Sequence, residues 1–413
     1  MRILFVHQSF PGQYRHIVRS LASSGSHQIV ALGINNLAEP IPKSITYIQY
    51  KISRGNTVGL HDWLLDVDSK LIRGEACATQ ATQLKNDGFT PDIICAHPGW
   101  GEALFLKDIW PNVPLLCYQE FYYNSYGFDF DFDPEFSSQM AWTDRARIRF
   151  KNINPMSMLE ASNWNVTPTH FQRSTFPQAS RQRISVIHDG IDTTYATPIS
   201  TPQPLPLPDG TVVKANELNV TFVNRSIEPY RGCHTFIRSI PYILDKCPEA
   251  HIFIVGSPDT VSYGMASPNL SWRDTFLAEI SGNYDPTRIH FTGALPYSNF
   301  IHLLQLSKCH VYLSYPFVLS WSMLEAMSIA CPIVGSRTAP VQEFIQSGHN
   351  GLLVDFFSPK ELSEAIKTIL TDVKLSKNLG EQARNLIESR YSLKKCVPLQ
   401  LALIELVQSG ALD

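Results

Sequence analysis

Two arginines and a glycine follow a short apolar segment in the second half of the chain. Arg225 and Arg231 lie in the loop after the predicted strand 219–223, and Gly232 precedes a helical pattern with one apolar stripe. A guanidinium group donates forked hydrogen bonds to phosphate oxygens, and a helix N-terminus adds fixed N–H donors. The segment therefore predicts a diphosphate site. Pairing of both arginines with a local carboxylate such as Glu228 is the alternative, and position alone does not decide between the two.

A single glutamate, Glu325, lies in the otherwise apolar helical segment 321–328, which also follows a predicted strand. Glutamate is rarely buried without a partner, so its carboxylate at this place could accept hydrogen bonds from ribose hydroxyls. N–H groups at the start of the same helix could add to diphosphate binding, and they belong to Ser320, Trp321 and Ser322. The alternative is an ordinary exposed glutamate on a helix surface.

The first half of the chain also carries polar residues behind predicted strands. His97 lies in a glycine-rich loop, where a single histidine is more often structural than functional. Aromatic and acidic side chains alternate in residues 129–135, and this composition suits carbohydrate, because C–H faces stack on rings while hydroxyls need acceptors. A solvated loop is an equal alternative. The glycine and the spacing of a calcium loop are missing, so no metal is predicted.

Parallel sheets are the expected framework for these residues. Short apolar runs rich in valine and isoleucine alternate with helical patterns along the whole chain, as in βαβ units. The strands predicted in the first half are 3–6, 28–32, 46–50, 93–95, 115–118, 164–167 and 184–188. Those predicted in the second half are 219–223, 251–255, 289–292, 310–315, 333–336 and 352–354. Ligands bind at the carboxyl ends of such strands, where the candidate residues lie.

Prolines and helix-capping residues in the sequence predict a domain boundary and the ends of helices. Five prolines in the segment 198–208 predict a stiff linker at a domain boundary. Ser358 and Glu361, with a proline between them, form a capping box that predicts a helix. Two amphipathic helices are predicted at 375–390 and 393–409, and spacing alone leaves open which domain the last one covers.

Length and composition favour a folded protein of two domains. The 413 residues exceed the size at which one hydrophobic core usually stops growing, and 44% of them are hydrophobic. A net charge of −3 gives no overall positive field for nucleic acid. No apolar run suits a signal peptide or a membrane span, so we expect a cytoplasmic protein. The eight cysteines form no C-x-x-C pair that would indicate zinc or redox chemistry.

Several of these motifs together resemble those of glycosyltransferase family 4, whose members are retaining enzymes with the GT-B fold. In the second half the resemblance rests on Arg225, on Arg231 with Gly232, and on the segments 291–297 and 324–336. In the first half, residues 187–192 resemble the family's segment before the interdomain linker, and residues 10–14 occupy the place of its N-terminal glycine loop. The similarity extends over nearly the whole chain.

The resemblance implies an α/β protein with two Rossmann-like, doubly wound domains that face a central cleft. Residues 1–199 would form the acceptor-side domain, with the C-terminal helix 391–413 packed back on it, and residues 200–390 would form the nucleotide-sugar donor domain. Closure of the two domains would exclude water and bring His97 and the Gly12 loop to the sugar.

Individual roles follow from the same resemblance. Arg225 and Arg231 would bind the donor diphosphate, Glu325 would hold the ribose, and His97 would face the acceptor and the donor sugar. The backbone of Gly293, Ala294 and Leu295 would face the base. One departure concerns the position eight residues before Glu325, where the family has a glutamate and this chain has Phe317. A phenyl ring cannot accept hydrogen bonds from sugar hydroxyls, which leaves the identity of the donor sugar open.

The expected activity is transfer of a sugar from a nucleotide diphosphate sugar to a hydroxyl acceptor such as a glycan, glycolipid or polysaccharide precursor. The donor is taken as UDP-linked, and the reaction is expected to need neither a metal nor a cofactor. The expected partners are these two substrates, and no nucleic-acid partner is expected. Peripheral membrane association, the linkage and the oligomeric state stay open. One alternative is a nucleotide-sugar epimerase or a phosphorylase, although no pyridoxal lysine motif supports the latter. Another is a catalytically impaired scaffold subunit that binds nucleotide sugar, an alternative motivated by Phe317.

Overall fold

The computed structural model describes residues 1–137, 140–268 and 271–412, and the chain divides into two compact units. The first unit comprises Met1–Gly190 with Leu393–Asp413, and the second comprises Ile191–Ser392. The observed boundary precedes the predicted one at residue 199 because the intervening segment packs on the second unit. There, the backbone oxygen of Ala196 accepts a hydrogen bond from the Ser328 hydroxyl (2.6 Å).

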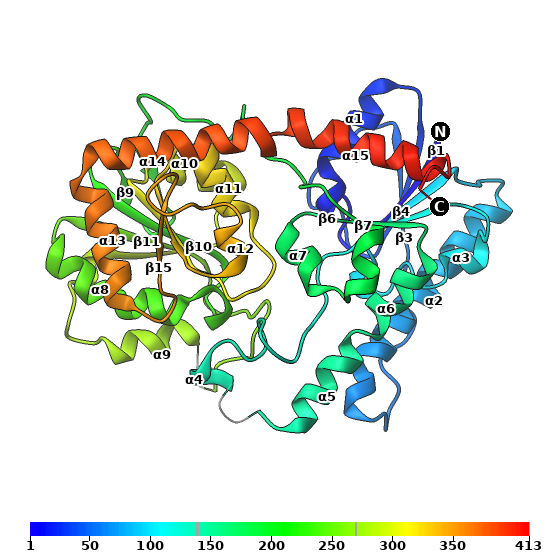
Figure 1. Ribbon diagram of the computed structural model, residues 1–413, viewed down its shortest axis with the longest axis horizontal. Coiled ribbons are helices and arrows are strands. Elements are labelled where there is room, and N and C mark those ends of the chain that lie inside the picture. The colour runs from blue at the N-terminus through cyan, green and yellow to red at the C-terminus, as the bar shows by residue number, and fades with distance from the viewer. Residues whose placement is uncertain (138–139, 269–270, 413) are drawn as a thin grey trace. The chain divides into compact units, whose positions relative to one another are not determined.

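The first unit is built on a seven-stranded parallel sheet with the order β3-β2-β1-β4-β5-β6-β7 (Figure 1). Its strands, all of which the sequence predicts to within a few residues, are β1 (Arg2–Val6), β2 (Gln28–Gly33), β3 (Ile45–Gln49), β4 (Ile93–Ala96), β5 (Leu115–Tyr118), β6 (Trp164–Thr167) and β7 (Ile184–Val186). Its helices are α1 (Arg15–Ser24), α2 (Leu65–Asn86), α3 (Leu106–Ile109), α4 (Pro134–Ser137), α5 (Trp142–Lys151), α6 (Ile153–Ala161), α7 (His170–Thr175) and α15 (Leu393–Gln408). This is a Rossmann-like order, in which the direction of winding reverses between β1 and β4.

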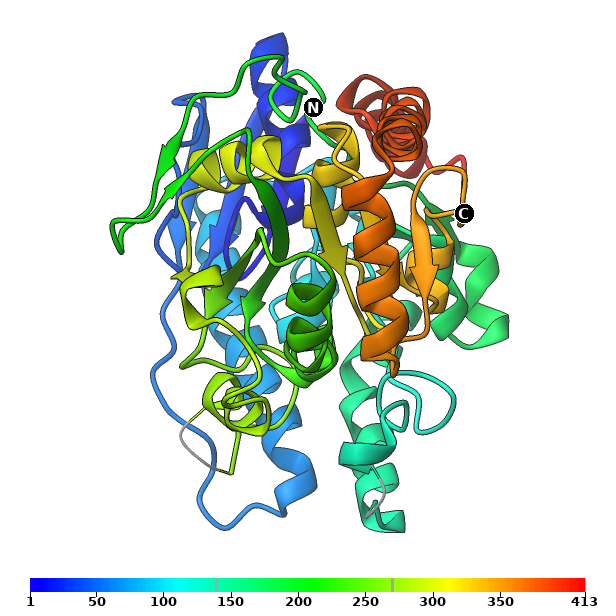
Figure 2. The ribbon, with the colours of Figure 1, turned by 90° about the vertical axis from the view of Figure 1, so that its left-hand side faces the viewer.

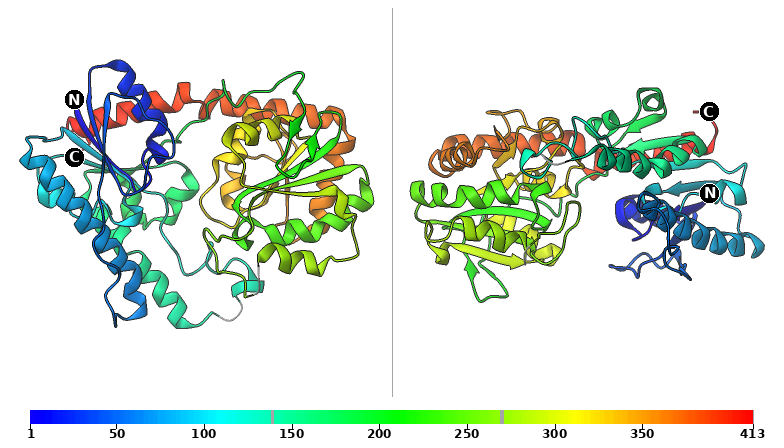
Figure 3. Two further views of the ribbon diagram at one scale, coloured as in Figure 1. Left: turned by 180° about the vertical axis from the view of Figure 1, so that it is seen from behind. Right: turned by 90° about the horizontal axis from the view of Figure 1, so that it is seen from below.

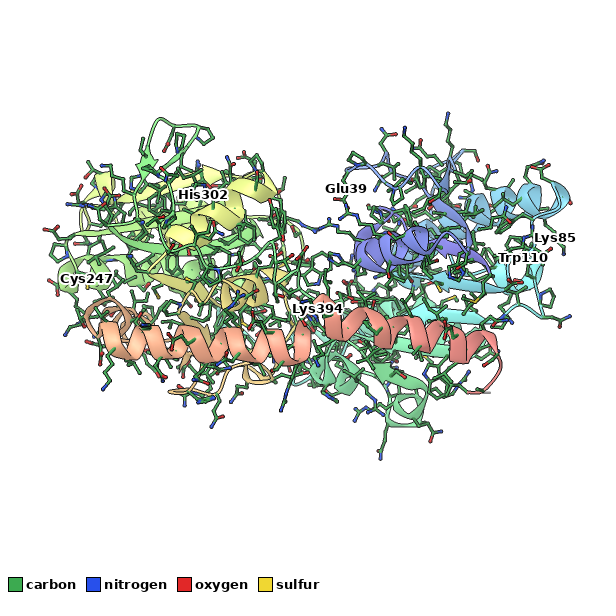
Figure 4. The ribbon with its side chains drawn as sticks, turned by 90° about the horizontal axis from the view of Figure 1, so that it is seen from above. Glu39, Lys85, Trp110, Cys247, His302 and Lys394 are labelled. Carbon is green, nitrogen blue, oxygen red and sulfur yellow. The ribbon has the colours of Figure 1, made fainter. Side chains whose placement is uncertain are left out.

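The last helix, α15, belongs to the first unit although it is farthest from that unit in sequence. It contacts α1, β4 and β5, and it is the red helix of Figure 3. Leu403, Ile404 and Val407 of α15 are buried in the same hydrophobic cluster as Ile3 and Phe5 of β1. Lys394 marks the beginning of this helix in Figure 4. Burial of these side chains accounts for the return of the chain to the first sheet.

The second unit is built on a six-stranded parallel sheet with the order β12-β11-β10-β13-β14-β15 (Figure 2). The strands are β10 (Leu218–Ser226), β11 (Ala250–Ser257), β12 (Ile289–Gly293), β13 (Cys309–Tyr312), β14 (Ile333–Ser336) and β15 (Leu352–Val354). The helices are α8 (Cys233–Lys246), α9 (Trp272–Glu279), α10 (Tyr297–Leu306), α11 (Trp321–Ser328), α12 (Ala339–Gln342), α13 (Pro359–Thr371) and α14 (Val373–Leu386). The winding direction reverses between the adjacent strands β10 and β13, so both units repeat the same topology.

The sequence predicted that the proline-rich segment 198–208 is a linker. This prediction is wrong for the second half of the segment. Its second half forms β8 (Leu205–Pro206), which pairs antiparallel with β9 (Val212–Val213). Leu205 and Leu207 are buried against Phe253 of β11. His302, labelled in Figure 4, donates a hydrogen bond to the backbone oxygen of Gln203 (2.7 Å). Apolar burial therefore holds this segment on the second unit. A short two-stranded hairpin tolerates the prolines.

The predicted helices near the C-terminus are present. The Ser358 hydroxyl caps α13 by accepting from the Glu361 N–H (3.2 Å), but the Glu361 carboxylate accepts from the N–H of Asp355 rather than from the cap residue. A π-helical turn, Ile387–Tyr391, separates α14 from α15 at the predicted break. No helix in the described ranges combines the length and the apolar character that crossing a bilayer requires.

Candidate functional site

The strands β10 and β13 lie side by side at the switch point of the second sheet, with Phe222 paired to Val311. Arg231 lies in a 3₁₀ turn, Pro229–Arg231, that follows β10, and Ser320 caps α11 after β13. Because the connections leave these two strands toward opposite faces of the sheet, the loops part here and leave room for a ligand. The sequence-predicted diphosphate residues therefore occupy the expected place in the topology.

Arg231 is a buried cation held by neutral groups. Its side chain is only 5% exposed, and its guanidinium donates to the hydroxyls of Ser314 (2.7 Å) and Tyr312 (3.3 Å). Burial opposes the charge, yet the hydroxyls of Tyr312 and Tyr263 and the nearby Glu228 raise the pKa of the guanidinium above its usual value. Within the described ranges, Arg231 forms no ion pair with a carboxylate. Its positive charge is thus not neutralised by an ion pair inside the unit.

The hydroxyl of Tyr312 joins Arg231 to the start of α11. The same oxygen that accepts from Arg231 also accepts from the backbone N–H of Ser320 (2.8 Å). The Ser320 hydroxyl in turn accepts from the N–H of Ser322 (3.3 Å). A guanidinium and a helix N-terminus therefore converge on one point, although two of the N–H groups predicted to face a diphosphate are already hydrogen-bonded within the protein.

Aromatic rings cover the guanidinium of Arg231. Its central carbon lies 5.2 Å from the ring centroid of Tyr263 and 5.8 Å from that of Phe317, which is itself buried. Phe317 also packs edge-on against Tyr230, at 5.5 Å between centroids. The position where the resemblance predicts a glutamate is thus occupied by a ring in an aromatic cluster around the cation.

Gly232 is required by the backbone next to Arg231. Its φ of +70° lies in the left-handed region, and a Cβ there would come within 2.5 Å of the Leu313 side chain. This glycine ends the turn that carries Arg231 and caps α8. It therefore allows the close approach that directs Arg231 toward β13.

Glu228 does not neutralise the two arginines through an ion pair, so the alternative considered from the sequence is not supported. One oxygen of its fully buried carboxylate accepts from three consecutive backbone N–H groups, those of Ser262, Tyr263 and Gly264, at 3.1, 3.1 and 3.2 Å. The carboxylate instead fixes the loop that places the Tyr263 ring over Arg231. Sequence reasoning missed this role because the partners lie more than thirty positions away.

Arg225 and Glu325 lie in contrasting environments. Arg225 is exposed at the end of β10 and has no hydrogen bond or ion pair among the described residues. Glu325, on α11, is only 8% exposed, and its Oε1 accepts a hydrogen bond from the hydroxyl of Tyr297 (2.7 Å). The glutamate is therefore not an ordinary surface residue, which was the alternative reading of its helix.

The turn predicted to face a base follows β12. Gly293 has a φ of +66° and open space where a Cβ would lie, while Ala294 is exposed and Leu295 is half-buried. The turn leads directly into Tyr297, the first residue of α10. The second unit thus places this turn and Glu325 near each other through the Tyr297 hydrogen bond.

In the first unit His97 is a buried, neutral ring. It is 1% exposed and packs between Trp100 and Tyr118, at 4.4 and 5.4 Å between centroids. Burial, together with neighbouring His7, holds its pKa well below the ordinary value. Its Nδ1 accepts from the Gly99 N–H (3.2 Å), so the proton is on Nε2. This packing agrees with the structural alternative, and contact with a substrate stays a prediction.

The Gly12 loop packs against His7, whose ring lies 5.1 Å from that of His97. Gly12 has a φ of +48°, and a Cβ on it would come within 2.3 Å of the His7 ring. His7 Nδ1 accepts from the Ser9 N–H (2.9 Å), so its Nε2 donates to the side-chain oxygen of Gln13 (2.7 Å). The structure therefore brings the two sequence-predicted residues of this unit together, with His7 between them.

Two family models match the chain in succession. One, described as glycosyl transferase family 4 group, matches residues 25–196, and the other, described as glycosyl transferases group 1, matches residues 211–386. The gap between the two matches, residues 197–210, lies in the second unit, a few residues after the boundary between the units.

Curated relatives are similar over part of the chain. An uncharacterized glycosyltransferase of Methanocaldococcus jannaschii, MJ1069, is 29% identical over 44% of this chain and 43% of its own length. D-inositol 3-phosphate glycosyltransferase of Corynebacterium glutamicum is 25% identical over 50% of this chain and 47% of its own length. The matches thus span less than half the length of these relatives.

Solved structures are similar over the whole chain. Sucrose-phosphate synthase from Thermosynechococcus elongatus covers 100% of both chains with a TM-score of 0.74 and 15% identity. Anabaena HepE in complex with UDP and glucose covers 98% of this chain and 99% of its own, with a TM-score of 0.66 and 16% identity. These likenesses confirm the predicted fold class, the GT-B type with two parallel-sheet α/β units.

Proposed function

Because the chain belongs to the glycosyltransferase family 4 group, we propose that it is a retaining transferase. In this proposal it moves a sugar from a nucleotide diphosphate sugar to a hydroxyl acceptor such as a glycan, glycolipid or polysaccharide precursor. Binding of the donor by the second unit is the central element of the proposal, and this unit is matched by the group 1 family model.

The observation that carries the proposal is the environment of Arg231. A buried guanidinium that is surrounded by hydroxyls and rings, without a carboxylate in an ion pair, leaves a positive charge to be balanced by a ligand. A diphosphate supplies that charge and matches the forked geometry of a guanidinium. The N-terminus of α11 lies against the same Tyr312 oxygen and adds a dipole of the favourable sign.

The other donor contacts follow the topology of the second unit. Exposed Arg225 at the end of β10 would bind the diphosphate from the solvent side, where salt screens its effect. Glu325 would accept from the ribose hydroxyls, and the turn at Gly293, Ala294 and Leu295 would face the base. UDP is proposed as the nucleotide because HepE, a structural neighbour, was solved with UDP and with UDP-glucose.

Chemistry at the leaving group would then require no metal. As the bond between the anomeric carbon and the phosphate oxygen breaks, negative charge develops on the diphosphate, and the fixed guanidinium of Arg231 stabilises it without reorganisation. No residue is proposed as a covalent nucleophile, since retention by attack on the leaving-group face needs none. Metal independence and retention are both parts of the proposal.

The scaffold alternative is kept for one specific reason. Phe317 removes a carboxylate from the aromatic cluster around Arg231, so a chain that binds nucleotide sugar without transferring the sugar is a consistent second candidate. A nucleotide-sugar epimerase would instead change the configuration of the donor sugar without an acceptor. The transferase, the scaffold and the epimerase predict different results in one assay, which makes them separable by experiment.

The test is nucleoside diphosphate release from a panel of UDP-, GDP- and ADP-sugars, in EDTA, with and without hydroxyl acceptors. Acceptor-dependent release of one nucleotide, with the α-configuration kept in the product by NMR, supports the retaining transferase. Binding without release supports the scaffold, and a changed sugar without acceptor supports the epimerase. Release that requires added Mg²⁺ or Mn²⁺ would remove metal independence from the proposal.

A further inference from the structure

Glu325 is a buried carboxylate, and one hydrogen bond that supports it comes from another helix. It lies in the middle of α11, whose neighbouring side chains Leu324 and Ala326 are fully buried and apolar. A carboxylate in such surroundings needs hydrogen bonds to remain charged. The hydroxyl of Tyr297 supplies one at 2.7 Å to Oε1. The direction of this carboxylate is therefore partly set by a residue outside its own helix.

Tyr297 itself would be mobile without further support, because its side chain is 45% exposed at the first position of α10. Its ring stacks on that of Tyr195, with 5.4 Å between centroids and 10° between planes. It also lies tilted against Phe300, one turn along α10, at 6.0 Å. Stacking in offset geometry holds the phenol in one orientation.

Tyr195 lies in the segment 192–197, which follows the boundary between the two units and precedes the proline-rich segment. Hydrogen bonds hold this segment in place. The Asp192 carboxylate accepts from the N–H groups of Thr194 and Tyr195, each at 3.1 Å, and so closes a tight turn. The next residues are pinned to both helices, because Ser328 of α11 donates to the Ala196 oxygen (2.6 Å) and Gln305 of α10 donates to the Thr197 oxygen (2.8 Å). The turn, α10 and α11 therefore form one support.

We infer that Tyr297 is a positioning residue for nucleotide recognition, which acts by fixing the carboxylate of Glu325 for a ligand with vicinal ribose hydroxyls. The phenol donates to Oε1 and so restricts the orientation of the carboxylate, and with it the direction of Oε2. A buried carboxylate of restricted orientation discriminates against a ligand that lacks a matching hydroxyl, because the hydrogen bond to that hydroxyl is then lost. Tyr297 and Tyr195 thus contribute to selectivity for a ribonucleotide over a deoxyribonucleotide.

This inference rests on the proposed role of Glu325 in donor binding, so its test separates the two. The probes are UDP, GDP and ADP, and for whichever binds most tightly its 2′-deoxy and 3′-deoxy forms, measured by calorimetry. Wild type, Tyr297→Phe, Tyr195→Ala and Glu325→Gln are compared. Tyr242→Phe is the matched control, since it removes an exposed phenol hydroxyl from α8 of the same unit.

Tyr297→Phe is expected to weaken the ribonucleotide about fivefold to tenfold and the deoxynucleotides less, so that the ratio between them falls. Tyr195→Ala should lower the same ratio by a smaller factor, and Tyr242→Phe should leave it unchanged. The inference is overturned if Tyr297→Phe keeps the wild-type ratio while Glu325→Gln loses it. If no nucleotide binds to wild type, or if Glu325→Gln has no effect, the proposed function of this site fails instead and the inference fails with it. Because Tyr195→Ala tests the same support at another residue, misfolding of one variant does not remove the test.

Discussion

The guanidinium of Arg231 donates a 2.7 Å hydrogen bond to the hydroxyl of Ser314, a neutral partner for a buried charge. Such an arrangement costs folding free energy, because a charge removed from water without a carboxylate in an ion pair is only partly compensated by hydroxyls. In an enzyme this cost is recovered when an anionic ligand binds. The contact therefore connects the stability of the second unit to its proposed affinity for a diphosphate.

Replacement of the buried cation should separate these two effects. Arg231→Met keeps much of the side-chain length and removes the charge, so we expect affinity for a nucleoside diphosphate to fall about 30-fold or more while the free energy of unfolding stays equal or rises. Arg231→Lys should retain part of the affinity, since a point charge remains without the fork. Calorimetry and thermal unfolding measure the two quantities. A variant that is destabilised and binds with wild-type affinity would show that Arg231 is purely structural.

Loss of the Glu228 carboxylate should release the loop over Arg231. Glu228→Ala leaves three backbone N–H groups without their acceptor, and we expect a loss of about 2–3 kcal/mol of stability together with faster amide exchange at residues 262–264. Glu249→Ala, at an exposed glutamate of the same unit, is the control and should change neither quantity. Unchanged exchange in the loop would contradict the tethering role.

Removal of buried side chains from α15 should destabilise the first unit. Leu403 is buried against β1, whereas Leu399, one turn earlier, is 57% exposed. We expect Leu403→Ala to cost about 2–4 kcal/mol and Leu399→Ala less than about 0.5 kcal/mol. Thermal or urea unfolding measures the difference. Equal effects of the two substitutions would mean that α15 does not pack on the first sheet in solution.

Buried histidines should make stability fall in mild acid. Burial lowers the pKa of His188 from 6.5 to about 4, and burial likewise lowers that of His7 to about 4 despite its hydrogen bonds to Gln13 and Ser9. The unfolded chain then binds more protons than the folded chain between these values, so stability present above about pH 6.5 is lost as the pH falls toward about 4. Each histidine contributes up to about 3 kcal/mol to this loss.

His188→Asn should flatten that dependence by the contribution of one histidine. Asparagine can still accept the hydrogen bond that Nδ1 receives from the Gly190 N–H (3.0 Å), but it does not titrate. Urea unfolding at several pH values between about 7 and 4.5 gives the slope. A variant with the wild-type slope would show that His188 is not desolvated in the folded protein.

The framework of the protein could be predicted from sequence because it depends on local patterns. Buried parallel strands read as apolar runs, and all thirteen strands of the two large sheets lie where such runs occur. Arg225, Arg231 and Glu325 could be singled out because charged residues behind such strands are unusual. The short hairpin in the proline-rich segment was missed, since its burial depends on contacts with Phe253 that no local pattern shows.

The partners of the site residues could not be predicted for a similar reason. Tyr312 is separated from Arg231 by 81 positions, and Tyr297 from Glu325 by 28 positions. Each of these tyrosines reads locally as an ordinary strand or helix residue. The burial of His97 between Trp100 and Tyr118 likewise depends on tertiary packing, although the tryptophan lies only three positions away. Tertiary packing thus determines which polar residues are accessible and which are supports.

The most direct test of the central claim is calorimetric titration of UDP, GDP and ADP into wild type and Arg231→Met in the presence of EDTA. We predict that one nucleotide binds wild type without a metal and that its affinity falls about 30-fold or more in the variant. Equal affinity of the two proteins, or binding that appears only after a divalent cation is added, would contradict a metal-independent diphosphate site at Arg231.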